Sequence, residues 1–368
     1  MPSVIVIGAG VVGASIAWEL SGAGCRVQLL DARTPGDGAT RASAGVLAPY
    51  IEGHPDSPLR DLGRQSLDLY DDFVARLRGE SHREVAYDRS GTLEVALSDA
   101  HAERLAAASA ALWHDGVEAR WVPPVAVPDV EPGVTSSAAG GLLIPVHGAV
   151  GVASLTAAAV AAAIARGVEV VQECGALDIE QTAGGGVTVR HGAGVFEADH
   201  VVLAAGSWSS QVRVSGADPV PVKPVRGQLL QLGGRRGVIG RVIWGEHGYL
   251  VPWADGSVLV GATVEDVGFD ESTTPDARRQ LMEMATSLVP ELANAGIADM
   301  RAGLRPRGPD DLPLIGRSRV VHGLVYATAH FRNGVLLAPL TAQLVRRLVV
   351  DPAASTLPAL DPGRCGHL

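Results

Sequence analysis

The feature that most limits the fold is a glycine turn near the start of the chain. In the run MPSVIVIGAGVVGASIAWELSGAG, Gly8, Gly10 and Gly13 directly follow the apolar segment 4–7. That segment predicts a short buried strand, and 14–23 has the composition of a helix. A strand that turns through G-x-G-x-x-G into a helix is typical of the first unit of a parallel, dinucleotide-binding sheet. We therefore expect an α/β fold.

Each glycine of the turn has a mechanical role. Gly8 permits the tight turn, Gly10 leaves room for a pyrophosphate, and Gly13 lets the helix pack closely on the strand. A second predicted strand, 26–30, ends at Asp31, where an acid accepts hydrogen bonds from ribose hydroxyls and disfavours a 2′-phosphate. The pattern predicts a dinucleotide site and argues against NADP. It does not separate NAD from FAD, and an ordinary strand–turn–helix stays open as the alternative.

Length and charge narrow the class of protein. A chain of 368 residues is long enough for two domains or one large discontinuous domain. The net charge of −10 and the absence of a basic run argue against nucleic acid as a partner. Lys223 is the only lysine and stands in a plain Pro-Val-Lys-Pro setting, so we expect a structural role for it rather than Schiff-base chemistry.

The cysteines and the hydropathy pattern bear on location. Cys25, Cys174 and Cys365 are far apart and odd in number, which argues against a disulfide framework or a metal site. No basic and apolar leader precedes the first predicted strand. The longest apolar stretch, 157–165, is too short to span a bilayer. We expect a cytoplasmic protein with no transmembrane segment and no bound metal.

Two later segments repeat the pattern of an apolar strand followed by a glycine-containing turn. The run HVVLAAGSWS predicts a strand over 201–204 that enters Ala205 and Gly206, which suits a second close approach of backbone to the same ligand. Near the C-terminus, a predicted strand over 325–328 is followed by a turn and a long helix over 335–349. An N-terminal unit completed by later segments is a discontinuous domain, and the stretch between is rich in predicted strands.

These motifs together resemble a known family. The runs VIGAGVVGASIAWEL, TRASAGVLAP, VVLAAGSWS, PVKPVRGQ, GYLVPWADGSVLVGAT, AGLRPRGPDDLPLIG and ATAHFRNGVLLAP are similar to those of flavin-dependent oxidases of the D-amino-acid oxidase superfamily, and most of all to the glycine oxidase group. The first run is common to many flavoproteins, whereas the last three in this order are specific. The resemblance covers nearly the whole chain.

The resemblance implies an α/β (α+β) fold with a discontinuous Rossmann-like FAD-binding domain and a second, antiparallel-sheet substrate domain. The expected bounds are 1–82, 144–217 and 308–368 for the FAD-binding domain, and 83–143 and 218–307 for the substrate-binding domain. Relatives with covalent flavin use a cysteine near 305–316, and this chain has none there, so FAD is expected to be non-covalent. The implied cofactor-binding residues are Gly8, Gly10, Val12, Gly13, Asp31, Ala32, Thr40, Arg41, Ala44, Gly45, Val46, Ala176, Gly206, Trp208, His330, Phe331, Arg332, Asn333, Gly334, Val335 and Leu336.

The resemblance also implies the substrate residues. Tyr249, Arg305 and Arg332 match the family's substrate-contact positions, and an arginine fork suits a carboxylate because it can donate two parallel hydrogen bonds. His247 stands two residues before Tyr249 and would share its face of a strand. The alternatives are that Arg305 forms a structural ion pair, that Tyr249 is a core aromatic, and that Arg332 serves the flavin.

The implied activity is the oxidation of glycine or another small amino acid or secondary amine. Hydride would pass from the α-carbon to flavin N5, the imine would hydrolyse to an oxo acid and ammonia, and O2 would give hydrogen peroxide. The family precedent links this reaction to thiamine biosynthesis. A dehydrogenase with another electron acceptor, an oxidase of a glycyl-type adduct in secondary metabolism and a non-enzymatic nucleotide-binding protein stay open. A homo-oligomer is expected from the resemblance alone.

Overall fold

The computed structural model describes residues 1–53, 56–175, 177–192, 194–233 and 237–368. Its N-terminal unit is the expected one: β1 (Ser3–Ile7), α1 (Val11–Gly22) and β2 (Arg26–Leu30), with β1 and β2 paired in parallel. The helix starts at Val11, three residues earlier than the sequence predicts, because the Ala14 N–H already donates to the Gly10 carbonyl. The whole turn therefore ends directly at a helix N-terminus.

The close packing around this turn explains two of its glycines. Gly8 has φ +102°, and a Cβ there would lie 2.4 Å from the carbonyl oxygen of Ala204. A Cβ on Gly13 would lie 1.8 Å from the carbonyl oxygen of Gly8. A larger residue at Gly8 would push the turn away from Ala204, and one at Gly13 would push the helix away from the turn.

The parallel sheet is assembled from distant segments. Its strand order is β20-β21-β13-β1-β2-β9, which confirms the predicted discontinuous α/β unit. Strand β20 pairs with β21 in the antiparallel direction, and all other neighbouring strands of this sheet pair in parallel. The added strands are β9 (Glu169–Val171), β13 (His200–Leu203), β20 (Leu314–Arg317) and β21 (Leu324–Thr328).

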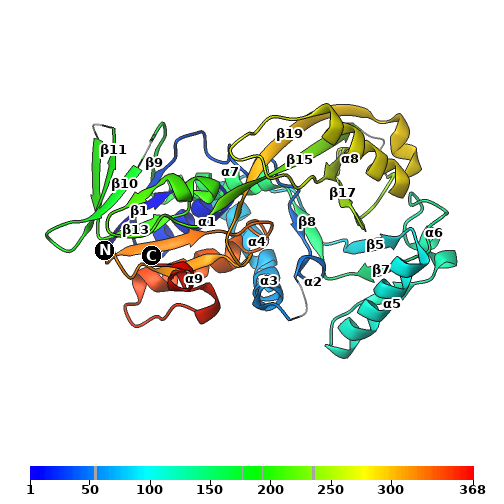
Figure 1. Ribbon diagram of the computed structural model, residues 1–368, viewed down its shortest axis with the longest axis horizontal. Helices are drawn as coiled ribbons and strands as arrows, with labels where there is room; N and C mark the ends of the chain where they lie inside the picture. The colour runs from blue at the N-terminus through cyan, green and yellow to red at the C-terminus, as the bar shows by residue number, and fades with distance from the viewer. Residues whose placement is uncertain (54–55, 176, 193, 234–236) are drawn as a thin grey trace.

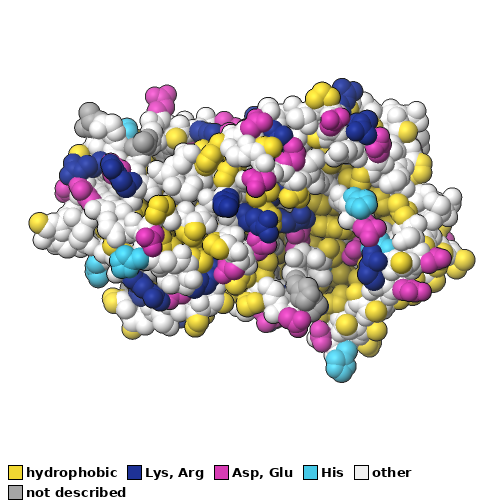
Figure 2. All heavy atoms as spheres, viewed as in Figure 1, with side chains coloured by type: hydrophobic (Ala, Val, Ile, Leu, Met, Phe, Trp, Pro, Cys, Tyr) yellow, Lys and Arg dark blue, Asp and Glu magenta, His cyan; other side chains and the backbone are white. Residues whose placement is uncertain are grey.

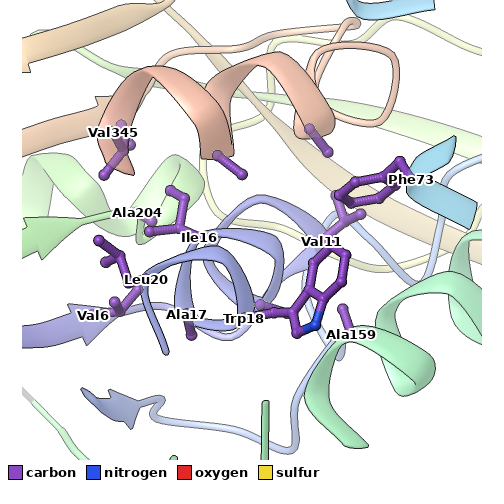
Figure 3. Packing of buried hydrophobic residues seen from close by; sticks show 14 of the residues in the cluster. Val6, Val11, Ile16, Ala17, Trp18, Leu20, Phe73, Ala159, Ala204 and Val345 are labelled. Carbon is purple, nitrogen blue, oxygen red and sulfur yellow. The ribbon is translucent and has the colours of Figure 1, made fainter. Parts of the chain in front are cut away.

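Helix α1 lies at the centre of the largest hydrophobic core. It packs between α7 (Val152–Ala165) and α9 (Ala338–Val350), and α4 (Tyr70–Ser81) follows α3 (Pro58–Asp68) against the same core. Figure 3 shows Ile16 facing Val345 of α9, and Trp18 beside Phe73. The two rings meet edge to face, with centroids 5.4 Å apart. Because α1 is covered on all sides, it has no polar stripe to mark it in the sequence.

A second sheet occupies the other half of the molecule (Figure 1). Its order is β19-β15-β18-β17-β16-β5-β7-β6, and every pair is antiparallel except β16 with β5. Helices α5 (Asp99–His114) and α8 (Pro275–Leu288) pack against it. The strands are β5 (Thr92–Ala96), β6 (Arg120–Val122), β7 (Gly140–Ile144), β15 (Lys223–Gly233), β16 (Val242–Gly245), β17 (Gly248–Pro252), β18 (Val258–Gly261) and β19 (Gly296–Arg307).

Smaller elements complete the fold. One three-stranded sheet joins β3 (Val46–Leu47), β8 (Gly148–Val150) and β4 (Tyr87–Asp88). A four-stranded sheet runs β12-β11-β10-β14, from β10 (Leu177–Gln181), β11 (Val187–His191), β12 (Gly194–Ala198) and β14 (Arg213–Val214). Short helices include α2 (Pro49–Glu52) and α6 (Val127–Val130). Within the described ranges, no helix has the length and apolar character needed to cross a bilayer. The exact domain bounds stay a prediction.

Candidate functional site

A cavity of about 390 Å³, here called the long cavity, runs past the carboxyl ends of the parallel strands to the second sheet. It is lined by the turns after β1, β2, β13 and β21, and by Tyr249 of β17 and Arg305 of β19. In α/β sheets, ligands bind outside the carboxyl ends of the strands. Figure 2 shows Lys and Arg side chains grouped in the middle of one face, beside a hollow lined by hydrophobic side chains.

Asp31 organises one end of this cavity. Its Oδ2 accepts the Ala9 N–H at 2.6 Å, and its Oδ1 accepts the Arg33 N–H at 2.8 Å. Burial raises the pKa of Asp31, while these hydrogen bonds oppose the rise. Thr40 adds a contact from the other side, since its Oγ1 accepts the Val11 N–H at 3.0 Å. Asp31 therefore holds the glycine turn in shape, a role beyond the ribose contact that the sequence predicts.

The turn after β13 faces the same end of the cavity. Gly206 has φ +53°, and a Cβ there would meet no atom within 4 Å, so this backbone borders open space. Trp208 follows it, with the Arg33 guanidinium 4.3 Å from its ring centroid. Arg33 is held in turn by Glu271 at 2.8 Å. No local pattern marks Arg33 or Glu271, because their partners come from distant parts of the chain.

The structure gathers most of the predicted cofactor residues along the long cavity. Those that line it are Gly8, Gly10, Val12, Asp31, Ala32, Thr40, Ala44, Gly206, Trp208, His330, Phe331, Arg332, Gly334 and Val335. Those that do not are Gly13, Arg41, Gly45, Val46, Asn333 and Leu336. The predicted contact at Ala176 lies outside the described residues.

The residues away from the cavity have other visible roles. A Cβ on Gly45 would lie 1.8 Å from the Val150 carbonyl oxygen, so this glycine allows close packing of the chain on the end of β8. Arg41 is exposed and pairs with Asp37 at 3.4 Å. Asn333 is buried and its N–H donates to the His330 carbonyl. Direct contact of these residues with a cofactor remains a prediction.

The turn after β21 is less helical than the sequence predicts. Helix α9 begins at Ala338 and not at 335, because the preceding residues form turns that are tied to β19 and to one another. The Phe331 N–H donates to the Pro306 carbonyl, and Phe331 has φ +47°. His330 is buried with its Nε2 3.0 Å from Thr341 Oγ1, and burial lowers the pKa of His330 to about 4. This turn thus presents a neutral imidazole and a constrained backbone to the cavity.

Tyr249 and Arg305 meet at the other end of the long cavity. Arg305 Nη1 donates to the Thr263 carbonyl at 3.0 Å, which fixes the guanidinium against the sheet. Burial raises the pKa of Tyr249, and the nearby Arg305 and Arg332 oppose that rise. Burial lowers the pKa of Arg305, and the Tyr249 hydroxyl partly offsets this. The pair offers a partly buried cation and a phenol hydroxyl, the donors that a carboxylate takes.

Gly227 of β15 makes room for the Arg305 guanidinium. On the paired strands, Val225 lies opposite Arg305 and Gly227 lies opposite Gly303. A Cβ on Gly227 would lie 2.2 Å from both Nη atoms of Arg305. The PVRGQ run drew attention in the sequence, but only the strand register shows what its glycine does.

Arg332 does not stand free in the cavity. Its Nε donates to Glu52 Oε2 at 2.7 Å, and its Nη2 donates to Glu52 Oε1 at 2.8 Å. Glu52 ends the short helix α2, 280 residues earlier in the chain. No sequence signal identifies Glu52, which lies three residues beyond the TRASAGVLAP run and meets its partner only in the folded chain.

His247 lies elsewhere. Gly245 of β16 pairs with Gly248 of β17, so Glu246 and His247 form the hairpin turn between the strands. The expectation that His247 shares a strand face with Tyr249 is therefore wrong. His247 lines a separate cavity, together with His101 and residues of α8.

The shape and donors of the long cavity fit a dinucleotide such as FAD. One end has a glycine turn at a helix N-terminus, an acid and open space beside Gly206, which suit a pyrophosphate and a ribose. The other end has a partly buried cation, Arg305. Among the described residues, no group of His, Cys, Asp and Glu could hold a metal ion.

Comparison with known proteins gives a consistent result. A family model described as "FAD dependent oxidoreductase" matches residues 3–348. The chain is 32% identical over 359 residues to the bifunctional protein ThiO/ThiG of Trichormus variabilis, which covers 96% of this chain and 53% of that protein. The chain thus spans about half the length of that relative. It is 31% identical to the glycine oxidase of Geobacillus kaustophilus, over 94% of this chain and 92% of the relative.

Solved structures agree with the sequence matches. The crystal structure of glycine oxidase from Geobacillus kaustophilus aligns with a TM-score of 0.93 and 29% identity, over 99% of both chains. That of iminodiacetate oxidase from Chelativorans sp. BNC1 aligns with a TM-score of 0.88 and 25% identity, over 98% of both chains. The match over nearly the whole chain, with the glycine turn and cavity in place, shows that this protein belongs to the DAO family of FAD-dependent oxidoreductases.

Proposed function

We propose that the protein is an FAD-dependent oxidase of glycine or another small amino acid or secondary amine. The observation that carries the proposal is the meeting of Arg305 and Tyr249 at the end of the long cavity away from the glycine turn. A cation and a hydroxyl donor at that place suit the carboxylate of an amino acid. The similarity to glycine oxidases over nearly the whole chain supports the same substrate class.

The residues of the chain act mainly by binding and orienting the substrate. Arg305 stays charged because a guanidinium does not lose its proton in proteins, so it can pair with the substrate carboxylate. Burial keeps the pKa of Tyr249 above its ordinary value, so the phenol keeps its proton and donates a second hydrogen bond. Two contacts on the carboxylate fix the position of the α-carbon, and such positioning lowers the barrier to reaction.

FAD, when bound, supplies the acceptor for the hydride that leaves the α-carbon. The oxidised substrate is an imine, and water hydrolyses it to an oxo acid and ammonia, or to an oxo acid and a primary amine where the substrate is a secondary amine. The two electrons pass finally to dioxygen, which yields hydrogen peroxide. Gly8, Gly10, Asp31, Thr40 and the turn that begins at His330 would hold the cofactor without a covalent link. The similarity to bifunctional ThiO/ThiG proteins supports a place in thiamine biosynthesis.

The test is a peroxide assay with glycine, sarcosine and D-alanine on the purified protein loaded with FAD. We expect peroxide and ammonia in equal amounts with glycine and D-alanine. No oxidation of any of the three would refute the proposal. Oxidation coupled to a quinone dye but not to oxygen would identify a dehydrogenase instead.

The matching variant is Arg305→Met, which keeps an unbranched apolar stem and removes the guanidinium fork. Leaving the substrate carboxylate unpaired in a partly buried site costs about 3–5 kcal/mol in kcat/KM. Oxidation of ethylamine, which has no carboxylate, should fall much less. If glycine turnover by Arg305→Met stays within a few-fold of the parent, Arg305 is structural and Arg332 becomes the candidate for the clamp.

A further inference from the structure

The substrate end of the long cavity contains a carboxylate of its own. Glu52 and Arg332 form a two-point ion pair with donor–acceptor distances of 2.7 and 2.8 Å. The Glu52 side chain is 14% exposed and that of Arg332 is 31% exposed, so the pair lies at the cavity wall and not on the outer surface. Both residues line the cavity together with Tyr249 and Arg305.

The pair sets the charge of this end. The charged residues that line the described long cavity are Asp31, Arg33 and Asp37 beside the glycine turn, and Glu52, Arg305 and Arg332 near Tyr249. Glu52 cancels the charge of Arg332. The substrate end is left with the single positive charge of Arg305, which balances one carboxylate.

The geometry also occupies the hydrogen-bonding fork of Arg332. Two of its N–H groups already point at Glu52, in the arrangement that a second substrate carboxylate would need. A dicarboxylate would have to displace Glu52 or lie beside it, and like charges at close range disfavour binding. An amine with one carboxylate and a small neutral substituent meets neither obstacle.

We propose that Glu52 is a specificity-determining residue, which restricts the site to amines with a single carboxylate by neutralising Arg332. The inference rests on the proposed function, because it takes the Arg305 end as the substrate site. In this proposal Arg332 contributes to substrate specificity, and Arg305 binds the substrate carboxylate. It also predicts that loss of the Glu52 charge converts Arg332 into a second carboxylate site.

Two non-oxidisable ligands test this directly on the FAD-loaded protein. Methoxyacetate has the shape of sarcosine with one carboxylate, and diglycolate has the shape of iminodiacetate with two. The parent protein should bind methoxyacetate more tightly, as measured by calorimetry. In Glu52→Gln, the ratio of diglycolate to methoxyacetate affinity should rise about tenfold to a hundredfold, the value of one or more charge-assisted hydrogen bonds.

Steady-state kinetics test the same preference between dicarboxylate and monocarboxylate substrates. The kcat/KM of iminodiacetate relative to glycine should rise in Glu52→Gln by a similar factor. The double variant Glu52→Gln/Arg332→Met should lose the gain, because the freed fork is then absent. Glu180→Gln removes a carboxylate that pairs with Arg190 on the four-stranded sheet and should leave both ratios unchanged.

The outcomes separate the two proposals. If none of glycine, sarcosine and D-alanine is oxidised, the proposed function fails. If glycine is oxidised but Glu52→Gln leaves the ligand ratio unchanged, the inference about Glu52 fails alone. A parent protein that prefers diglycolate overturns the inference without any variant. Should Glu52→Gln not fold, Arg332→Gln keeps the Glu52 charge, and it must bind diglycolate no better than the parent does.

Discussion

Replacing Gly227 with alanine adds one methyl group directly under the Arg305 guanidinium. The new Cβ would lie 2.2 Å from both Nη atoms and 2.3 Å from Cζ. To regain an ordinary contact of 3.4 Å, the guanidinium must retreat by about 1.2 Å. Its hydrogen bond to the Thr263 carbonyl, now 3.0 Å long, would lengthen or break.

The cost falls on activity more than on stability. The clashing atoms are the far end of a flexible side chain, so the strand itself need not move, and alanine in a strand interior is no less favourable than glycine. A displacement of about 1 Å in a group that positions substrate lowers the rate about a hundredfold. We expect kcat/KM for glycine to fall by about that factor, while FAD content and thermal midpoint stay near those of the parent.

The assay is oxygen-coupled steady-state kinetics with glycine and ethylamine, beside thermal unfolding and flavin absorbance. Gly233→Ala is the matched control on the same strand, because its Cβ would meet only the Gly296 carbonyl oxygen at 3.6 Å. Wild-type kcat/KM for glycine in Gly227→Ala would show that Arg305 does not work from this position. An equal loss with ethylamine would show that the variant disturbs more than carboxylate binding.

Three further outcomes are expected. Acid precipitation should release FAD into the supernatant, and flavin that stays with the protein pellet would contradict a non-covalent link. Asp31→Ala should raise the Kd for FAD about ten- to a hundredfold, since Asp31 orients the turn at the Ala9 and Arg33 N–H groups, and an unchanged Kd in a fluorescence titration would exclude this role. Burial lowers the pKa of His147 to about 3 in the folded protein, whereas in the unfolded chain this residue binds a proton below about pH 6.5. The free energy of unfolding should therefore fall as the pH drops from 6.5 toward 3, and His147 alone should account for a loss of about 2 kcal/mol at pH 5. His147→Phe keeps the stack on Tyr50 and should remove that part of the acid loss in denaturant titrations at pH 8 and pH 5, whereas an unchanged difference would mean that His147 titrates normally.

Much of the fold could be predicted because it depends on local signals. The strand, glycine turn and helix at the N-terminus are consecutive in the sequence, and the apolar runs of β13 and β21 mark two more buried strands. Where the end of a helix depends on contacts with residues far away in the sequence, the observed boundary differs from the predicted one by a few residues. Helix α9 starts late because the turn before it is tied to β19 through Phe331.

The site was predictable only in part, for the same reason. Tyr249 and Arg305 come from strands that the family motifs mark, and the structure brings them together. His247 was misplaced because hairpin register decides which residues leave the strand. Glu52 belongs to no motif, and Gly227 belongs to the PVKPVRGQ run without any sign there of its role; the importance of both comes from side chains that lie far away in the sequence.

Local sequence patterns were enough to predict the dinucleotide unit and its discontinuous completion, because glycine spacing and apolar periodicity act over a few residues. Arg305 and Tyr249 were expected only from the family resemblance. The charge of the substrate end and the position of the Arg305 guanidinium became visible only in the tertiary structure. A carboxylate on α2 neutralises an arginine 280 residues later, and a glycine on one strand makes room for a guanidinium on its neighbour. Such contacts depend on which elements pack against each other in the folded chain, and local sequence patterns do not predict them.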